Sequence, residues 1–436
     1  MEYVSTRPDR PLSGEVAVPG DKSLSHRAVL FAAMAGGTSR LTGVLDSEDV
    51  HASIGAVRAL GANVEIVAAA GRGLELVVTG WGEDGPCCPD VPIDCGNSGT
   101  TARLLLGILA GWDTEVTLIG DESLSKRPMG RVTDPLTLMG ASFDSPTGTL
   151  PVTVRGGGLQ VIDYATPVAS AQVKSAILLA GLRAAGRTTV REPAPSRDHT
   201  ELLLPAFSVP VGRDPAARVA WVEGPAALRS SDITVPGDPS SAAFMVAASL
   251  LVPGSRITVT GVGLNPTRIA YLDVLDRMGA DIRIQPFEAA GGEPVGAVRV
   301  GYTRELRPAI VRAAEVPALV DEIPVLALLA TQAAGETRFE DVGELRVKES
   351  DRLTAVVEGL TLLGASAHVE GDTLVVRGPA DLRGARLDSR GDHRLAMTWA
   401  LAGLPSDGPV TVSGFEAVDV SYPSFAADLA ALSAKG

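Results

Sequence analysis

The sequence predicts an α/β protein of two domains, each built from three copies of a βαβαββ unit. The first observation is a duplication: Val-Pro-Gly-Asp at residues 18–21 recurs at residues 235–238, half the chain away. A strand-like run precedes both copies and a helix-like run follows both. The second is that six helix-like runs each follow a polar residue suited to capping. The third is a Gly-Ala pair that ends a second helix in most copies, as expected of glycine at a helix C-terminus.

The expected helix starts define the length of the repeat. They lie at Asp21, Asn97, Ser170, Asp238, Asp321 and Asp392. Their spacing of about 70 residues is longer than that of common solenoid repeats, which favours three copies packed into one compact domain. After most of these helices comes a glycine and then a Thr-rich strand, as at residues 37–41 and 254–259.

The sixth copy runs out of chain near Gly436. We therefore expect the N-terminal strand, which ends near Pro19, to complete the C-terminal domain. The predicted domains are residues 21–235, and residues 1–20 together with 236–436.

Composition limits the class of protein and its partners. The 436 residues are 45% hydrophobic and 21% charged, as in ordinary soluble proteins. A net charge of −14 argues against nucleic acid and anionic membranes as partners. No apolar run reaches the ~18 residues of a membrane span, and no signal peptide is expected. With three cysteines and five histidines, we expect a cytoplasmic protein without disulfide bonds or a bound metal.

The predicted helix starts carry the residues expected of anion sites. A helix N-terminus has unpaired N–H groups and a partial positive charge, which favour anions. Lys22 and Arg27 open the first copy, Asn97 stands between two glycines in the second, and His393 and Arg394 open the sixth. Each feature alone fits an ordinary cap or turn, and the glycine of a P-loop is missing upstream of Lys22. Together they predict binding of phosphate-bearing anions.

The fifth copy differs in the sign of its charge. Asp321 stands where other copies have cations or hydroxyls, so it is a candidate general base. A mixed-charge cluster follows at residues 346–352. Lys348 and Arg352 are four residues apart and are predicted to share one helix face. The alternative interpretation of this cluster is a solvated charged surface.

Eight segments, in this order along the chain, resemble the 5-enolpyruvylshikimate-3-phosphate (EPSP) synthase family, the 3-phosphoshikimate 1-carboxyvinyltransferases. They are PGDKSLSHR, CGNSGTTAR, SKRPMGR, PVASAQVKSA, SRDHT, DEIPVLA, RVKESDRL and GDHRLAM. The resemblance runs from Leu12 to about Phe425. The sequences ASAQVKSA and RDHT are similar to those of the class II branch of the family. It implies the enolpyruvyl transferase fold, an inside-out α/β barrel, with the active site in the cleft between two closing domains.

The resemblance also implies an activity. The family transfers the enolpyruvyl group of phosphoenolpyruvate to the 5-hydroxyl of shikimate 3-phosphate and releases phosphate, through a tetrahedral intermediate on the route to chorismate and aromatic amino acids. No metal or organic cofactor is implied, and we expect a monomer. The family is the target of glyphosate, and Gly99 lacks a side chain that would block this inhibitor.

The site residues follow from the matching motifs. Asp321 is the expected base at the hydroxyl, Glu349 the expected acid at the methylene, and Lys22 assists. The residues implied for shikimate 3-phosphate are Lys22, Ser23, Arg27, Ser170, Gln172, Arg197, Asp321 and Lys348. Those implied for phosphoenolpyruvate are Lys22, Asn97, Gly99, Arg127, Gln172, Arg352, His393 and Arg394. Arginine suits such carboxylate and phosphate contacts because it can donate two parallel hydrogen bonds.

Three alternatives stay open. UDP-N-acetylglucosamine 1-carboxyvinyltransferase shares the fold and donor, but usually has Lys-Asn where this chain has Lys22-Ser23. It also has a reactive Cys, or sometimes Asp, on the loop equivalent to residues 121–131, where this chain has Asp121 and no Cys. A non-catalytic homologue that only binds a phosphorylated metabolite is the second alternative. The third is a paralogue acting on a related cyclitol phosphate.

Overall fold

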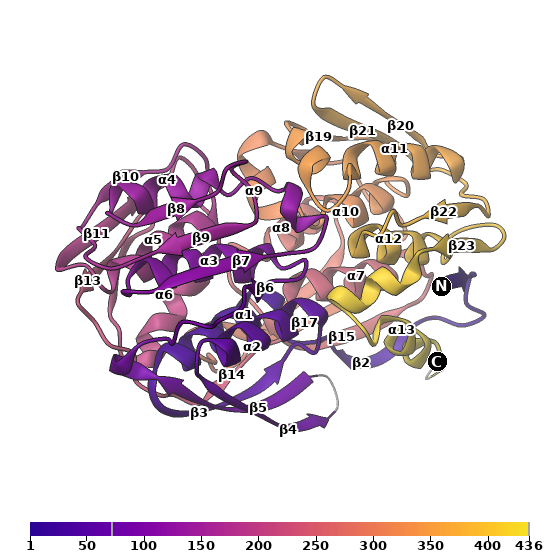
Figure 1. Cartoon of the computed structure of the whole chain (residues 1–436). Helices are drawn as coiled ribbons and strands as arrows, with labels where there is room; N and C mark the ends of the chain where they lie inside the picture. The colour runs from indigo at the N-terminus through magenta and orange to yellow at the C-terminus, as the bar shows by residue number, and fades with distance from the viewer. Residues whose placement is uncertain (71–72, 435–436) are drawn as a thin grey trace. The chain divides into compact units, whose positions relative to one another are not determined.

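The computed structural model describes residues 1–70 and 73–434 (Figure 1). The chain divides into two compact units by its contacts. Unit 1 comprises Met1–Pro19, Pro236–Glu288 and Pro294–Gly436, and unit 2 comprises Gly20–Val235 and Ala289–Glu293. The chain therefore passes between the units at four positions, and the short segment Ala289–Glu293 belongs to unit 2 although both its flanks belong to unit 1.

Unit 2 is built around three helices that begin the copies: α1 (Lys22–Met34), α3 (Gly99–Ala110) and α5 (Ala171–Gly181). In the described part of the chain, each copy has one four-stranded sheet and one outer helix. The sheets are β14-β3-β5-β4, β6-β7-β9-β8 and β10-β11-β13-β12. Their strands are β3 (Gly36–Val44), β4 (Asn63–Ala70), β5 (Gly73–Trp81), β6 (Ile93–Asp94), β7 (Glu115–Ile119), β8 (Ser142–Asp144), β9 (Val152–Arg155), β10 (Asp163–Ala165), β11 (Gly186–Arg191), β12 (Val211–Asp214), β13 (Val219–Gly224) and β14 (Ile233–Thr234). The outer helices are α2 (Glu48–Ala59), α4 (Gly130–Leu138) and α6 (His199–Leu203).

Unit 1 repeats this plan around α7 (Pro239–Leu251), α10 (Ile323–Ala330) and α12 (His393–Ala402), which pack on one another. Its described sheets are β16-β17-β15-β2, β18-β19-β21-β20 and β1-β23-β22. Their strands are β1 (Glu2–Ser5), β2 (Ser13–Ala17), β15 (Arg256–Gly263), β16 (Asp281–Pro286), β17 (Val295–Gly301), β18 (Ile310–Val311), β19 (Gly335–Phe339), β20 (Ser366–Glu370), β21 (Thr373–Gly378), β22 (Arg386–Asp388) and β23 (Val410–Ser413). The other helices are α8 (Ala270–Arg277), α9 (Val316–Leu319), α11 (Arg352–Leu362) and α13 (Phe425–Ala434).

The central helices of each unit are largely apolar and almost entirely buried, so they lie at the centre of the core. Helices α3 and α5 approach so closely that a Cβ on Gly107 would lie 2.4 Å from the carbonyl oxygen of Ala176. Glycine is therefore required at this contact for steric reasons.

Two strands pair outside the copy that they precede in sequence. Strand β2 comes before α1 but runs parallel to β15 of unit 1, with Val16 opposite Val259. Strand β14 comes before α7 but runs parallel to β3 of unit 2, with Ile233 opposite Leu41. In unit 2, strands from the two ends of the segment Gly20–Val235 thus lie in one sheet. In unit 1, a strand from the segment Met1–Pro19 lies beside one from the segment that begins at Pro236.

The sixth copy is shorter than the others. After β23 the chain continues into α13, and the described residues of this copy contain no further strands. Strand β1 pairs antiparallel with β23 instead, with Tyr3 opposite Val412 (Figure 1). The Tyr3 ring stacks on Phe415 at 4.3 Å between centroids.

Four of the six predicted helix caps are confirmed. The side chains of Asp21, Ser170, Asp238 and Asp392 accept backbone N–H groups of the helices that follow them. The prediction that Asn97 caps a helix is wrong, because Ser98 is the cap of α3 and its Oγ accepts from Thr101 N at 3.1 Å.

The prediction that Asp321 caps a helix is also wrong. Helix α10 begins at Ile323, and its N-cap is Glu322, without a capping hydrogen bond from its side chain. The physical reason is that α9 ends at Leu319, so the chain already has helical dihedral angles where it enters α10. The carboxylate of Asp321 is consequently available for another partner.

The predicted Gly-Ala helix ends are confirmed at four places. Gly61, Gly140, Gly279 and Gly364 all have positive φ, between +79° and +112°. A residue with a Cβ would be strained there, so these glycines end α2, α4, α8 and α11.

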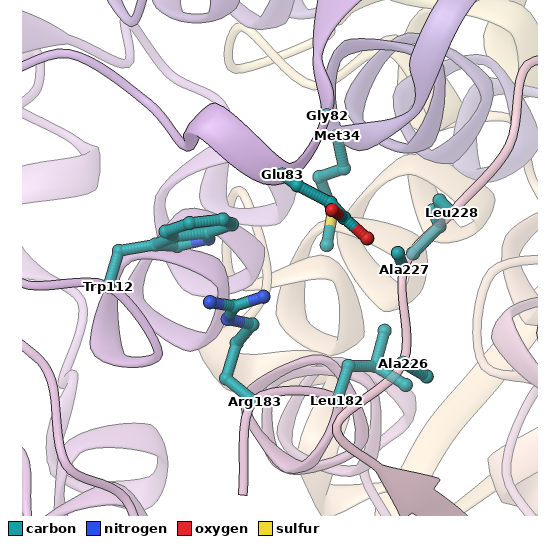
Figure 2. A pocket seen from close by; sticks show the side chains of 9 residues that line it. All are labelled: Met34, Gly82, Glu83, Trp112, Leu182, Arg183, Ala226, Ala227 and Leu228. Carbon is teal, nitrogen blue, oxygen red and sulfur yellow. The ribbon is translucent and has the colours of Figure 1, made fainter.

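A small pocket lies where the three central helices of unit 2 end (Figure 2). Met34 is the last residue of α1, Trp112 follows α3, and Leu182 follows α5 directly. The Arg183 guanidinium lies 3.9 Å from the centre of the Trp112 ring. The pocket lies at the opposite end of these helices from their N-termini. It is therefore separate from the predicted anion sites.

Candidate active site

The predicted site residues lie at the N-terminal ends of the central helices or on loops beside them. In unit 2, Lys22 is the first residue of α1, Gly99 the first of α3, and Gln172 the second of α5. In unit 1, His393 and Arg394 are the first two residues of α12, and both are buried. Each unit therefore carries its own set of polar residues at helix ends with a partial positive charge.

The start of α3 brings Asn97, Gly99 and Arg127 together as predicted. Arg127 Nη2 donates to Asn97 Oδ1 at 2.6 Å, and Asn97 Nδ2 donates to Asp121 Oδ2 at 2.6 Å. A Cβ on Gly99 would lie 3.5 Å from Arg127 Nη1 and 3.0 Å from Arg103 Nη1. The absence of a side chain at Gly99 therefore lets two guanidinium groups approach the helix N-terminus.

Arg103 is a site residue that the sequence prediction missed. Its Nη1 donates to Gln172 Oε1 at 2.7 Å, and so it links α3 to α5. Burial and then the charges of Arg127 and Arg131 lower the pKa of Arg103 to about 10. Two neighbouring guanidinium groups favour an anion between them. Because Arg103 is one helical turn after Gly99, this spacing could have identified it.

Asp49 is a second missed residue. Lys22 Nζ donates to Asp49 Oδ2 at 3.1 Å. Burial acts to raise the pKa of Asp49, but Lys22, His26 and Arg127 outweigh it and lower that pKa overall. Asp49 lies in the first turn of α2, where an acidic residue is ordinary, so the sequence contains no signal for this pairing.

Arg27 is almost fully buried, with 3% of its surface exposed. Its guanidinium donates to Thr200 Oγ1 at 2.8 Å, to the Ser23 carbonyl at 3.0 Å and to Ser175 Oγ at 2.9 Å. Burial lowers the pKa of Arg27 to about 10, and the carboxylate of Glu201 is the strongest influence in the other direction. Arg197 also acts on Arg27 electrostatically, so two predicted shikimate 3-phosphate residues are neighbours.

In unit 1, Arg352 forms ion pairs with both predicted acid–base residues, Asp321 and Glu349. Arg352 has no exposed surface and donates from Nη1 to Asp321 at 3.3 Å and from Nη2 to Glu349 at 2.6 Å. Its Nε donates to Asp392 at 2.7 Å. Burial disfavours the charged guanidinium, but these three carboxylates outweigh it and raise the pKa of Arg352. The side chains of Asp321 and Glu349 remain 19% and 35% exposed, so they are accessible from solvent.

The predicted helix face shared by Lys348 and Arg352 is wrong. Lys348 follows the 3-10 helix η5 (Gly343–Val347) in extended conformation, and α11 begins only at Arg352. Asp351 is the cap of α11, which requires a non-helical backbone between the two residues. Lys348 Nζ instead pairs with Glu344 at 2.5 Å.

The Arg394 guanidinium has hydrogen-bond donors that are available to a ligand. It is 5% exposed, and its Nε and Nη1 are buried without a hydrogen-bond partner among the described residues. Buried donors are normally satisfied, so these two atoms indicate a place for an anionic ligand.

Glu322 is a buried carboxyl group beside these residues that the sequence prediction missed. Ser240 Oγ donates to its Oε1. Burial and then the negative charge of Asp321 raise the pKa of Glu322 to about 7, against the attraction of Arg394.

Two absences hold for residues 1–70 and 73–434. No group of three or more His, Cys, Asp or Glu is placed to hold a metal ion. No helix in this part is long and apolar enough to cross a membrane.

The repeated α/β units form the fold of the enolpyruvyl transferases. The model of the family EPSP synthase (3-phosphoshikimate 1-carboxyvinyltransferase) matches residues 6–429. A 3-phosphoshikimate 1-carboxyvinyltransferase of Shouchella clausii is 48% identical over 416 residues, which cover 95% of each chain. The chain belongs to the EPSP synthase family, and this prediction is confirmed.

Solved structures agree in fold. An EPSP synthase structure from Acinetobacter baumannii has a TM-score of 0.89 at 38% identity, with 99% of this chain and 98% of that one covered. An enolpyruvyl transferase from Streptomyces tendae has a TM-score of 0.78 at 21% identity, which shows the fold alone. The predicted fold class is confirmed.

Proposed function

We propose that this chain transfers the enolpyruvyl group of phosphoenolpyruvate to the 5-hydroxyl of shikimate 3-phosphate and releases phosphate. One observation of the site carries the proposal within the family: Asp321 and Glu349, the two groups needed for proton transfer, share the guanidinium of Arg352. A chain that only bound the metabolite would have no need of both carboxylates at one place.

Shikimate 3-phosphate is proposed to contact unit 2 chiefly. Its carboxylate and phosphate need cationic and hydroxyl partners, which Arg27, Arg197 and the start of α5 supply. From unit 1, a carboxylate near the 5-hydroxyl is required. The proposed contacts are Lys22, Ser23, Arg27, Ser170, Gln172, Arg197, Asp321 and Lys348.

Phosphoenolpyruvate is proposed to bind between guanidinium groups. Arg127 lies at the start of α3 beside Gly99, and Arg394 has two buried donors without a partner among the described residues. The proposed contacts are Lys22, Asn97, Gly99, Arg127, Gln172, Arg352, His393 and Arg394. Since these residues belong to both units, the proposed active site is the cleft between two domains that close on the ligands.

The proposed chemistry has two steps. Asp321 removes the proton of the 5-hydroxyl while Glu349 protonates the methylene carbon, so that the hydroxyl oxygen bonds to the central carbon of phosphoenolpyruvate. The resulting tetrahedral intermediate then loses a proton from its methyl group and expels phosphate, which restores the carbon–carbon double bond. Lys22 assists at the bridging or phosphate oxygen. The reaction needs no redox cofactor because no carbon is oxidised overall.

A phosphate-release assay tests the proposed function. Phosphoenolpyruvate is supplied with shikimate 3-phosphate in one reaction and with UDP-N-acetylglucosamine in another. We expect phosphate only in the first. Release with the nucleotide sugar would assign the sister activity, and binding of shikimate 3-phosphate in a calorimeter without turnover would indicate a non-catalytic homologue.

The role of Asp321 is tested by Asp321→Ala. We expect turnover to fall by ~10²–10⁴-fold with little change in shikimate 3-phosphate binding, because a general base is lost. Asp163→Ala is the control, since Asp163 also pairs with an arginine but is 57% exposed on β10. Near-normal kcat in Asp321→Ala would refute the assignment.

The state in solution is proposed to be a cytoplasmic monomer, because each chain supplies both sets of residues. Light scattering of the purified protein at the concentration of the assay tests the monomer. A dimer that persists on dilution would contradict it.

A further inference from the structure

Helix α6 is held by three consecutive buried polar residues that each contact a different part of unit 2. The segment follows Arg197, one of the proposed shikimate 3-phosphate contacts. His199, Thr200 and Glu201 are 1%, 0% and 5% exposed. Their partners are Glu293 at 2.7 Å for His199, Arg27 and Ser175 for Thr200, and Lys174 at 2.8 Å for Glu201. A five-residue helix with so many buried polar contacts has a fixed position.

Thr200 is the member of this series that reaches the proposed site. Its hydroxyl oxygen accepts from Arg27 Nε at 2.8 Å and lies 2.7 Å from Ser175 Oγ. Ser175 in turn accepts from Arg27 Nη2 at 2.9 Å. The two hydroxyls and the guanidinium form a closed triangle that joins α1, α5 and α6.

Within residues 1–70 and 73–434, the hydrogen-bond partners of the Arg27 guanidinium are neutral. They are the Thr200 and Ser175 hydroxyls and the Ser23 carbonyl, and no carboxylate of this part accepts a hydrogen bond from it. Such partners fix the direction of the guanidinium without forming a salt bridge, and the carboxylate of Glu201 acts on it only through space. Arg27 has a long, flexible side chain, and the hydroxyls remove its alternative rotamers.

An ion pair beside the triangle keeps α6 against α5. Lys174 precedes Ser175, Glu201 follows Thr200, and their charged groups are 2.8 Å apart. Glu192 is a second buried partner of Lys174 at 2.8 Å. The hydroxyls of Ser175 and Thr200 are therefore placed by neighbours on both elements.

We propose that Thr200 is a positioning residue for shikimate 3-phosphate: its hydroxyl orients Arg27 and joins it to the segment of Arg197. The inference rests on the proposed function and adds a residue to it. Thr200 does not itself need to touch the substrate. Loss of its hydroxyl would leave a buried guanidinium donor without a partner and let the side chain turn away.

The test uses the full chain and the variant Thr200→Val, which keeps the shape of the side chain and removes only the hydroxyl. We expect the KM for shikimate 3-phosphate to rise about tenfold or more, as is typical for loss of a hydrogen bond to a charged group. The KM for phosphoenolpyruvate and kcat should change less than about threefold. Thr200→Ser restores the hydroxyl and should restore the KM.

Thr188→Val is the matched control. Thr188 lies on β11 of the same unit, is 0% exposed, and its Oγ1 has no hydrogen-bond partner among the described residues. The same substitution there should leave all kinetic constants unchanged. A merely structural effect of Thr200→Val would lower the melting temperature and raise both KM values together, or lower kcat alone, and would overturn the proposal.

The remaining outcomes separate this inference from the proposed function. Turnover by the unmodified chain with an unchanged KM in Thr200→Val overturns the positioning role only. An unmodified chain without turnover overturns both. If Thr200→Val does not fold, Ser175→Ala removes the other hydroxyl of the triangle, and the same selective rise in KM is expected of it. A uniform loss of activity in Ser175→Ala would overturn the proposal.

Discussion

The free energy of unfolding of Glu322→Gln, relative to that of the unmodified chain, should rise as the pH increases from 5 to 8. The carboxyl group is buried beside Asp321, and burial followed by that negative charge raises the pKa of Glu322 to about 7. Arg394 and Arg268 act in the opposite direction, as does the hydrogen bond from Ser240, but they do not outweigh burial. In the folded chain the group therefore keeps its proton at a pH where the unfolded chain has lost it.

The sign and size follow from linkage. Because the folded chain binds the extra proton, its stability falls as the pH rises from about 4.5 to about 7. The difference from the ordinary value of 4.5 corresponds to about 3 kcal/mol, since one pH unit is worth ~1.4 kcal/mol. Glutamine cannot ionise but can still accept from Ser240. Between pH 5 and pH 8, the variant should gain about 2 kcal/mol over the unmodified chain.

Urea unfolding at pH 5, 6, 7 and 8 measures this difference. Glu223→Gln is the control, because that glutamate is 58% exposed in an ion pair with Arg187 and should give curves parallel to those of the unmodified chain. If Glu322→Gln also gave parallel curves, Glu322 would be ionised throughout. The proposed influence of burial and Asp321 would then be refuted.

Two other predictions concern glycines. Gly107→Ala should lower the free energy of unfolding by about 1–3 kcal/mol, because its Cβ would lie 2.4 Å from a backbone oxygen of α5. Gly55→Ala, in the middle of α2 with nothing within 4 Å, should instead raise it by up to about 1 kcal/mol; equal urea midpoints for the two variants would contradict the steric argument. The unmodified chain should be inhibited by glyphosate, and Gly99→Ala should need a concentration about tenfold higher or more, since the new Cβ would face Arg103 and Arg127. Equal inhibition of both would show that the space at Gly99 does not admit the inhibitor.

Local features of the fold could be predicted from the sequence because their causes are local. A Gly-Ala pair ends a helix whatever surrounds it, and Asp21 or Asp238 caps the helix immediately after it. The errors at Asn97 and Asp321 have different causes. The side chain of Asn97 is held by Arg127 and Asp121, and Asp321 lies where the backbone is already helical between α9 and α10.

The buried contacts of the site could not be predicted in the same way. The motifs identify Lys22 and Arg352 as charged residues, but two of the carboxylates that pair with them, Asp49 and Asp392, come from distant parts of the chain. Asp49 has ordinary sequence surroundings, and only the packing of α2 brings it to Lys22. Glu322 directly follows the predicted base Asp321, but its burial and its contact with Ser240 depend on packing and are not visible in the motif. Such residues depend on distances between segments far apart in the chain, which the spacing of a motif does not contain.

The pairing of β2 with β15 has a consequence for synthesis on the ribosome. Strand β2 is synthesised before the main segment of unit 2, yet its neighbour β15 begins at Arg256, after that segment. For that interval β2 is an unpaired strand, which is a hazard for aggregation. Its sequence, Ser-Gly-Glu-Val-Ala, is short, contains a charge and has a glycine, and none of these favours association with other chains. Strand β2 can thus stay unpaired until β15 is synthesised with little risk of aggregation.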